Sequence, residues 1–89
     1  MAWKIELDPL AAKELNKLDK QVAKRLLSFL FNRLAVLDDV RSLGAALQGS
    51  ELGDFWKYRV GDYRIIAQIL DNEVIILVVK IGNRKEVYR

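Results

Sequence analysis

The sequence has 89 residues, of which 52% are hydrophobic and 30% are charged, and its formal net charge is +3 at pH 7. This composition predicts one globular domain over residues 1–89 with a modest core, and it excludes a disordered tail and a two-domain architecture. The moderate excess of positive charge favours polyanionic partners.

Cysteine and histidine are both absent. The commonest metal ligands and the usual general base are therefore missing, so we expect no metal and no cofactor, and any chemistry falls to Lys, Arg, Tyr and carboxylates. The lack of disulfides fits a reducing compartment. The start MAWKIELDPL has no signal-peptide pattern and no apolar run is long enough to span a bilayer, so we expect a cytoplasmic protein without a membrane partner.

The first half of the chain predicts a strand and a helical hairpin. Residues 3–7 alternate apolar with polar side chains, as in a half-buried strand. Asp8 followed by Pro9 predicts a helix start, and helical spacing continues to residue 19. Residues 20–37 predict a second amphipathic helix, and residues 40–47 a short helical connector. The second helix is expected to bury Val22, Leu26, Leu27, Leu30, Leu34 and Leu37 and to keep Lys20, Lys24, Arg25 and Arg33 mostly on a solvated face.

From Phe55 onward the apolar period changes to two. Residues 55–60, 63–70, 73–81 and 85–89 read as four strands joined by turns at 61–62, 71–72 and 82–83. The sequence therefore predicts an α+β fold: an N-terminal strand, a two-helix hairpin, and then an antiparallel four-stranded meander with the helices packed on one face of the sheet.

The stretch WKYRVGDYR places three cations on one face of the predicted sheet. A two-residue loop at 61–62 pairs residue 60 with 63 and Arg59 with Arg64. Alternation sends Lys57, Arg59 and Arg64 to the face opposite the aromatic side chains. Like charges opposed across strands repel, so we expect something negative there; the alternative is that the cations splay into solvent and prevent aggregation.

The last predicted strand extends this basic surface. Arg84, Glu86 and Tyr88 alternate to one face, and Lys85 and Val87 to the other. Arginine forks suit phosphate oxygens and a tyrosine ring offers a base something to stack on. Cations with an aromatic ring on an open sheet are typical of a site for single-stranded nucleic acid.

These residues carry a resemblance to a known family. The strand–helix–helix–meander order, FWKYRVGDYRIIAQI and GNRKEVY resemble the RelE toxins of bacterial toxin–antitoxin pairs, within the RelE/ParE superfamily. The resemblance implies a metal-independent endoribonuclease that cleaves messenger RNA in the ribosomal A site, and a cognate RelB-like antitoxin that inhibits it. The RVGDYR stretch does not separate nucleases from ParE-type relatives, which inhibit DNA gyrase.

The resemblance also implies site residues. It assigns Lys57, Arg59, Arg64, Arg84 and Tyr88 to catalysis, with Arg64 on the phosphoryl oxygens, Arg84 at the leaving group and Tyr88 against a base. The implied RNA-binding residues are Lys57, Arg59, Arg64, Arg84 and Lys85.

Two features depart from the family pattern. Arg59 stands where a lysine base is expected, and a guanidinium does not release its proton. Lys57 can serve as the base if the neighbouring cations disfavour its charged form, and Glu86 is another candidate. Alternatively, Arg59 only anchors phosphate, and the ribosome supplies the base or the reaction proceeds with weak base assistance. The chain also stops at Arg89, where some relatives continue into a helix. The apolar side chains on the cationic face are then expected to be partly open to an antitoxin segment, unless the inner strands are simply apolar on both faces. They are Ile66, Ile75, Leu77 and Val79.

The sequence leaves three functions open. The first is a ribosome-dependent messenger-RNA interferase, which the set of cations and Tyr88 favours. The second is a ParE-like toxin that inhibits gyrase without cleaving RNA. The third is an inactive relative that binds only its antitoxin.

Overall fold

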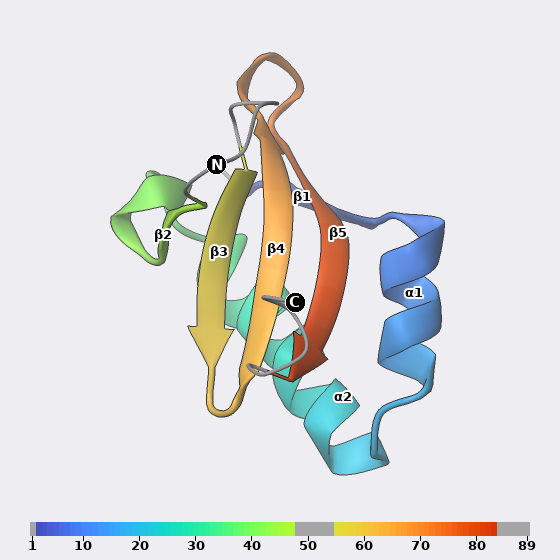
Figure 1. Ribbon diagram of the computed structural model, residues 1–89. Coiled ribbons are helices and arrows are strands. Elements are labelled where there is room, and N and C mark those ends of the chain that lie inside the picture. Colours follow the sequence, from blue (N-terminus) through green and yellow to red (C-terminus); the bar gives the residue numbers. More distant parts are fainter. Residues whose placement is uncertain (1, 48–54, 84–89) are drawn as a thin grey trace.

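The protein is described by a computed structural model that covers residues 2–47 and 55–83 (Figure 1). Its strands are β1 (Lys4–Leu7), β2 (Ala45–Ala46), β3 (Phe55–Val60), β4 (Tyr63–Leu70) and β5 (Ile75–Asn83). Its helices are α1 (Pro9–Asn16) and α2 (Lys20–Ser28), followed by a π-helical segment η1 (Phe29–Leu34) and two short 3-10 turns, η2 (Val40–Ser42) and η3 (Asp71–Glu73).

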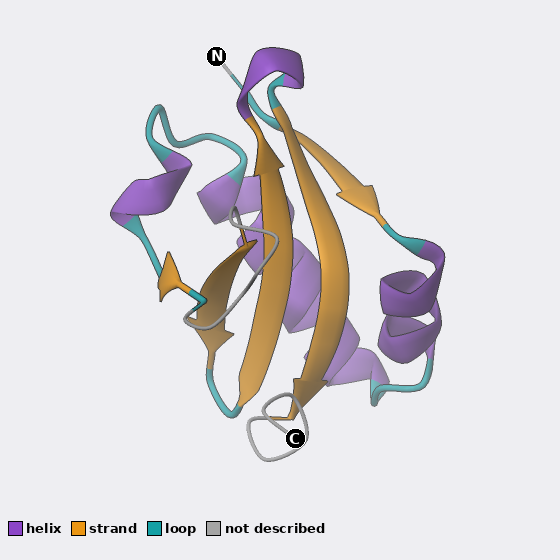
Figure 2. Cartoon of the chain, turned by 45° about the horizontal axis from the view of Figure 1, so that its top comes forward, coloured by secondary structure: helices purple, strands orange, loops and turns teal. Residues whose placement is uncertain are grey.

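The strands form one mixed sheet in the order β1-β5-β4-β3-β2. β1 pairs in parallel with β5, while β3, β4 and β5 form an antiparallel meander (Figure 2). The predicted α+β class, with an N-terminal strand, two helices and a meander, is confirmed. The fourth meander strand, predicted for residues 85–89, lies outside the described residues.

The helices begin where the sequence predicts and end earlier. Asp8 caps α1, because its carboxylate accepts a hydrogen bond of 2.8 Å from the N–H of Leu10, and Asp19 caps α2 in the same way. α1 ends at Asn16 instead of continuing to residue 19. The second helix changes to π-helical geometry at Phe29 and ends at Leu34. Within the described part of the chain, no helix is long and apolar enough to cross a membrane.

The core lies between the helices and one face of the sheet. Ala11 and Leu15 of α1 and Leu26 of α2 pack with buried side chains of the three meander strands. In Figure 1, α2 passes behind the sheet and α1 lies beside the β1–β5 edge, and both helices contribute to the same core. The buried residues of the helical layer continue with Leu30, Leu34 and Val40, and those of the sheet are Tyr58, Val60, Ile65, Ala67, Ile69, Ile76, Val78 and Ile81.

The β3–β4 hairpin has the predicted register. Val60 pairs with Tyr63 and Arg59 with Arg64. Gly61 has a φ of +61°, which a two-residue hairpin turn requires and which glycine adopts without strain. The turn chemistry in the sequence therefore decides which side chains of these strands face away from the helices.

Two connections differ from the prediction. The segment 40–47 is helical only over Val40–Ser42 and then forms β2, which pairs with β3 at the sheet edge. The β4–β5 connection is the 3-10 turn η3, and β5 starts at Ile75 instead of residue 73 because Val74 has a left-handed φ of +55°. Such a conformation is unfavourable for a β-branched residue and interrupts the extended chain.

A bulge interrupts the β4–β5 ladder. Ile66 pairs with Lys80 and Ala67 pairs with Val78, so Val79 is the extra residue of β5. Ile81 next to the bulge is held by α1, because its N–H donates to the Glu14 carboxylate at 3.1 Å. The extra residue reverses the facing of β5 side chains beyond Val79.

Candidate nucleic-acid interface

Three cations gather on the sheet face that the described helices leave uncovered. Lys57 and Arg59 come from β3 and Arg64 from β4, and together with Gly44 and Ala45 they line a hollow of about 210 Å³. The predicted shared face of the three cations is confirmed. Guanidinium groups in a concave, open site are suited to phosphate oxygens.

The three cations differ in how far solvent reaches them. Arg59 is exposed and Lys57 is half-buried, whereas Arg64 is only 7% exposed. The Arg64 guanidinium donates one long hydrogen bond of 3.4 Å to the carbonyl of Tyr63, and no carboxylate among residues 2–47 and 55–83 forms an ion pair with it. The alternative in which all three cations splay into solvent is therefore wrong for Arg64. A buried cation without a counter-charge favours an anionic ligand.

Two side-chain hydrogen bonds fix the wall of the hollow. Trp56 Nε1 donates to the carbonyl of Leu43 at 2.7 Å, and the Tyr58 hydroxyl donates to the carbonyl of Val40 at 2.8 Å. Burial raises the pKa of Tyr58 to about 12, so the phenol keeps its proton and remains a donor. Both bonds join the segment before β2 to strand β3.

Gly44 closes this wall against β3. Its φ is +73°, and a Cβ at this position would collide with the carbonyl oxygen of Lys57. Only glycine allows this backbone conformation and this close approach together. The wall of the hollow therefore depends on backbone placement as well as on cationic side chains.

An ion pair joins η2, in the segment before β2, to η3, the turn between β4 and β5. The Arg41 guanidinium forms two hydrogen bonds of 2.9 Å with the Asp71 carboxylate and lies over the Trp56 ring, 6.0 Å from its centroid. The hydrogen bonds from Arg41 hold the pKa of Asp71 below its ordinary value. η2 and η3, which are far apart in the sequence, are thereby joined.

The sequence prediction missed Lys80 as a member of the cationic face. Strict alternation from Ile76 and Val78 would turn Lys80 toward the core. The bulge instead pairs Lys80 with Ile66, which pairs on its other side with Lys57, so the two lysines flank Ile66 on the same face. The sequence did contain a signal for this bulge, because strict alternation would have buried the charged side chain of Lys80.

The apolar residues of this face are buried to different extents. Ile66 is 6% exposed, so the expectation that it is partly open is wrong. Ile75, Leu77 and Val79 are half-buried. Of these four side chains, only the three on β5 are therefore partly exposed to solvent, as expected.

Four predicted site residues cannot be placed. Arg84, Lys85, Glu86 and Tyr88 lie outside the described residues, so their contribution to this face stays a prediction. In the described part of the chain, no group of three or more His, Cys, Asp or Glu side chains is placed to bind a metal ion. What the described residues offer is a set of cations suited to binding phosphate oxygens.

Comparison with known proteins identifies the family. The family model described as ParE toxin of the type II toxin–antitoxin system parDE matches residues 5–88. The mRNA interferase toxin RelE of Escherichia coli K12 is 32% identical over 90 residues, which cover 99% of this chain and 92% of that protein. The chain belongs to the RelE/ParE superfamily of toxins. The resemblance seen in the sequence is thereby confirmed.

Solved toxin structures share the fold of this RelE-type toxin. The toxin–antitoxin complex RelBE2 of Mycobacterium tuberculosis contains a chain that matches with a TM-score of 0.83 at 21% identity, covering 97% of this chain and 95% of that one. The intact E. coli RelBE toxin–antitoxin complex matches with a TM-score of 0.72 at 26% identity, covering 92% and 96%. The arrangement of two helices on a five-stranded sheet is thus a RelE-type fold.

Proposed function

We propose that this toxin is a ribosome-dependent endoribonuclease that cleaves messenger RNA in the A site and so inhibits translation in the cytoplasm. The observation that carries the proposal is the hollow lined by Lys57, Arg59 and the nearly buried Arg64. The 32% identity to an mRNA interferase supports it. No metal or cofactor is part of the proposed chemistry.

The proposed reaction is attack of a ribose 2′-OH on the adjacent phosphate. The hydroxyl passes its proton to a base, the bond from phosphorus to the 5′ oxygen breaks, and the leaving oxygen takes up a proton. A 2′,3′-cyclic phosphate and a 5′-hydroxyl end result. Arg64 and Arg59 would stabilise the charge that develops on the phosphoryl oxygens, which is commonly the largest contribution to such catalysis.

Among the three described cations of the hollow, Lys57 is the proposed base. Its amine can accept the hydroxyl proton once deprotonated, whereas the Arg59 guanidinium cannot. Arg84 is proposed to donate a hydrogen bond that stabilises the charge on the leaving oxygen, which takes its proton from water. Tyr88 is proposed to stack on a base, and Lys85 to bind the RNA backbone. Glu86 is the competing base, and exchanging Lys57 alone distinguishes the two.

A RelB-like antitoxin is the proposed inhibitor. The E. coli relative of similar fold is found in an intact RelBE toxin–antitoxin complex. The half-buried Ile75 and Leu77 lie on the same sheet face as the cations and offer an apolar contact beside them. A segment with apolar and acidic side chains would cover both, and the toxin would then be blocked at its cationic hollow.

The alternative function is inhibition of DNA gyrase without RNA cleavage. The matching family model is that of a ParE toxin, which favours this alternative. The same cationic face would then dock a partner protein. The two functions differ in one observable, which is cleavage of messenger RNA that depends on Arg64.

The deciding experiment uses ribosomes stalled on a defined messenger. The purified toxin is added, and the 5′ ends of the products are mapped by primer extension, with Arg64→Ala and the distant surface variant Lys13→Ala in parallel. Cuts confined to the A-site codon, retained in Lys13→Ala and about a hundredfold slower in Arg64→Ala, would support the proposal. Growth arrest without cleavage would move the target to gyrase. Neither arrest nor cleavage would indicate a relative that only binds its antitoxin.

A further inference from the structure

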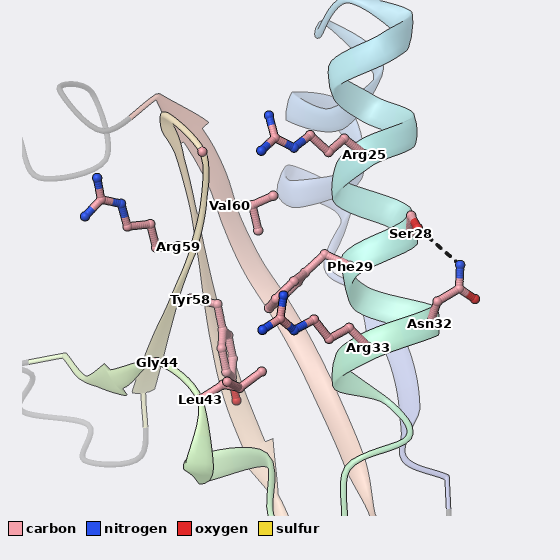
Figure 3. Close-up of a pocket in the computed structure, with 11 residues that line it drawn as sticks. Arg25, Ser28, Phe29, Asn32, Arg33, Leu43, Gly44, Tyr58, Arg59 and Val60 are labelled. Atoms are coloured by element: carbon pink, nitrogen blue, oxygen red, sulfur yellow. Dashed lines mark hydrogen bonds between the residues drawn. The ribbon is translucent and has the colours of Figure 1, made fainter.

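A second and larger cationic groove adjoins the hollow. It has a volume of about 470 Å³ and lies between the α2–η1 helix and the end of β3 (Figure 3). Arg25 and Arg33 extend from the helix toward β3, and Arg59 lines the groove from the strand. The neutral polar side chains of Ser28 and Asn32 also belong to its lining.

Within the described part of the chain, the arginines of this groove have no counter-charge. No carboxylate lines the groove, and among residues 2–47 and 55–83 none forms an ion pair with Arg25, Arg33 or Arg59. Surface arginines of a structural face are commonly matched with acids, as Arg41 is with Asp71 here. The guanidinium groups of Arg25 and Arg33, both directed at this groove, attract an anion.

The groove has a rigid frame. Phe29, which follows Arg25 by four residues and precedes Arg33 by four, packs on Tyr58 with 6.0 Å between ring centroids. The Arg25 guanidinium lies over the hairpin turn, where a Cβ on Gly61 would come within 3.1 Å of its Nη1. The helix is therefore held against the strand with both arginines directed at the groove. A preformed site binds its ligand at a lower entropic cost.

The groove and the hollow are continuous. Gly44 and Arg59 line both, and the Arg59 side chain reaches away from the helix, around the edge of β3 (Figure 3). The cations thus follow one path from Arg25 and Arg33, past Arg59, to Lys57 and Arg64. A connected line of cations matches the regularly spaced charges of a nucleic-acid backbone.

We infer that the groove is a second RNA site, which binds backbone phosphates of the same single strand whose neighbouring phosphate lies at Arg64. The inference deepens the proposed function and rests on it. The aromatic rings at the groove are engaged with one another and Tyr58 is buried, so the groove offers guanidinium forks more than open apolar anchors for a peptide. An acidic antitoxin segment is therefore the less favoured occupant.

The test measures binding of a 2′-O-methyl RNA dodecamer, which cannot be cleaved, by fluorescence anisotropy over a range of KCl concentrations. For single-stranded nucleic acid, each phosphate contact contributes about 0.7 to the slope of log affinity against log salt. The double variant Arg25→Gln with Arg33→Gln should lower that slope by about 1.4. Lys13→Gln with Lys20→Gln removes the same charge from other exposed positions and should leave the slope unchanged.

Two further comparisons locate the effect. Arg25→Lys with Arg33→Lys keeps the charges and should keep the slope, which shows that the glutamine pair acts through charge and not through misfolding. A 2′-O-methyl dinucleotide has a single phosphate and cannot occupy Arg64 and the groove at once, so its salt slope should fall less in the glutamine pair than that of the dodecamer. An unchanged dodecamer slope in the glutamine pair, or an equal loss in the Lys13 and Lys20 pair, would overturn the inference.

The outcomes separate this inference from the proposed function. Ribosome-dependent cleavage that needs Arg64, together with an unchanged RNA slope in the groove variant, would refute the groove alone. A groove-dependent slope in a toxin that cleaves no messenger would retain the RNA site and refute the nuclease. Normal RNA binding with lost antitoxin binding in the glutamine pair would assign the groove to the antitoxin and overturn the inference.

Discussion

At the scale of single residues, the cationic hollow depends on three side chains with different surroundings. Arg59 is exposed, Lys57 is half-buried and Arg64 is buried. All three positions are predictable from the sequence, because a hairpin turn and strict alternation decide their face. The burial of Arg64 was not predictable, because it depends on neighbours that only the folded chain brings together.

Exchange of the two β3 cations tests which of them acts as base. Lys57→Arg keeps the charge and removes the amine, so single-turnover cleavage on stalled ribosomes should fall at least a hundredfold. Arg59→Lys keeps a cation for the phosphate and should retain most of the activity. Equal activity of Lys57→Arg and the unaltered toxin would show that Lys57 is not the base and would favour Glu86 or a ribosomal group.

Tyr58 makes a testable contribution to stability. It is 1% exposed, and its hydroxyl donates to the Val40 carbonyl. Tyr58→Phe removes this bond and leaves the carbonyl without its partner, so the free energy of unfolding should fall by about 1–2 kcal/mol at pH 8. Urea denaturation followed by circular dichroism measures this difference.

The same variant reveals a pH dependence. The pKa of Tyr58 is about 12 in the folded protein against an ordinary value of 10.0. Below pH 10 both states hold the proton and the contribution of Tyr58 is complete; as the pH rises from 10 to 12 the unfolded chain ionises first, and roughly 2–3 kcal/mol is lost. The advantage of the unaltered toxin over Tyr58→Phe should therefore shrink across this range and be lost or reversed at its upper end. An advantage that stays constant would contradict the assigned cause.

At the scale of secondary-structure elements, local sequence signals and long-range contacts determine different parts of the fold. The capping aspartates and the 61–62 turn predicted the helix starts and the hairpin register correctly, because these signals act within a few residues. β2 and the bulge at Val79 were missed, because each depends on a distant strand. The change from α-helical to π-helical geometry at Phe29 was also missed, because neither a turn motif nor a proline marks it in the sequence.

The site was predictable to a similar degree. Its sheet cations were recognised because like charges are opposed across a hairpin. Arg25 and Arg33 were assigned to a solvated helix face, because the sequence does not show that this face lies beside the edge of β3. Lys80 was missed because the bulge reverses its side. Residues that are brought to the site by the packing of distant elements therefore cannot be predicted from the sequence alone.

The ion pair between η2 and η3 gives a prediction for these elements. The hydrogen bonds from Arg41 lower the pKa of Asp71, so the pair stabilises the fold above the ordinary carboxyl pKa and loses its effect as the pH falls through the lowered value. Asp71→Asn should be less stable than the unaltered toxin at pH 7, and the difference should narrow as the pH falls through the lowered pKa of Asp71.

Asp62→Asn is the matched control for this prediction. It removes the same charge from an exposed turn at the other end of β4. Urea midpoints of both variants at pH 7 and at low pH make the comparison. A loss at pH 7 that is equal in the two variants would show that Asp71 acts only through net charge.

At the scale of the whole molecule, one layer of helices covers one sheet face and the cations occupy the other face and the edge beside β3. The hollow is shallow, with about 210 Å³. A shallow site orients a flexible RNA poorly, and orientation by a larger partner then supplies much of the rate. This distribution is consistent with a toxin that acts on RNA held by the ribosome.

The proposed ribosome dependence can be tested directly. The same messenger is offered free in solution and in the A site of a stalled ribosome, and cleavage is followed with an excess of toxin. We expect cleavage of free RNA to be at least a hundredfold slower, because the scissile phosphate is not held against Arg64. Comparable rates on both substrates would show that the toxin positions RNA without the ribosome.

The parallel pairing of β1 with β5 has a consequence for how the toxin is made. Lys4 pairs with Ile75, so the first strand must wait for its partner until most of the chain has been synthesised. At 5–20 residues per second, that interval lasts about 4–14 s. Throughout this interval, the core face of the sheet lacks the buried side chains of β5, namely Ile76, Val78 and Ile81. The folded toxin therefore forms only after β5 has emerged, and under the proposed function we expect the nascent chain to be inactive toward the ribosome that is translating it.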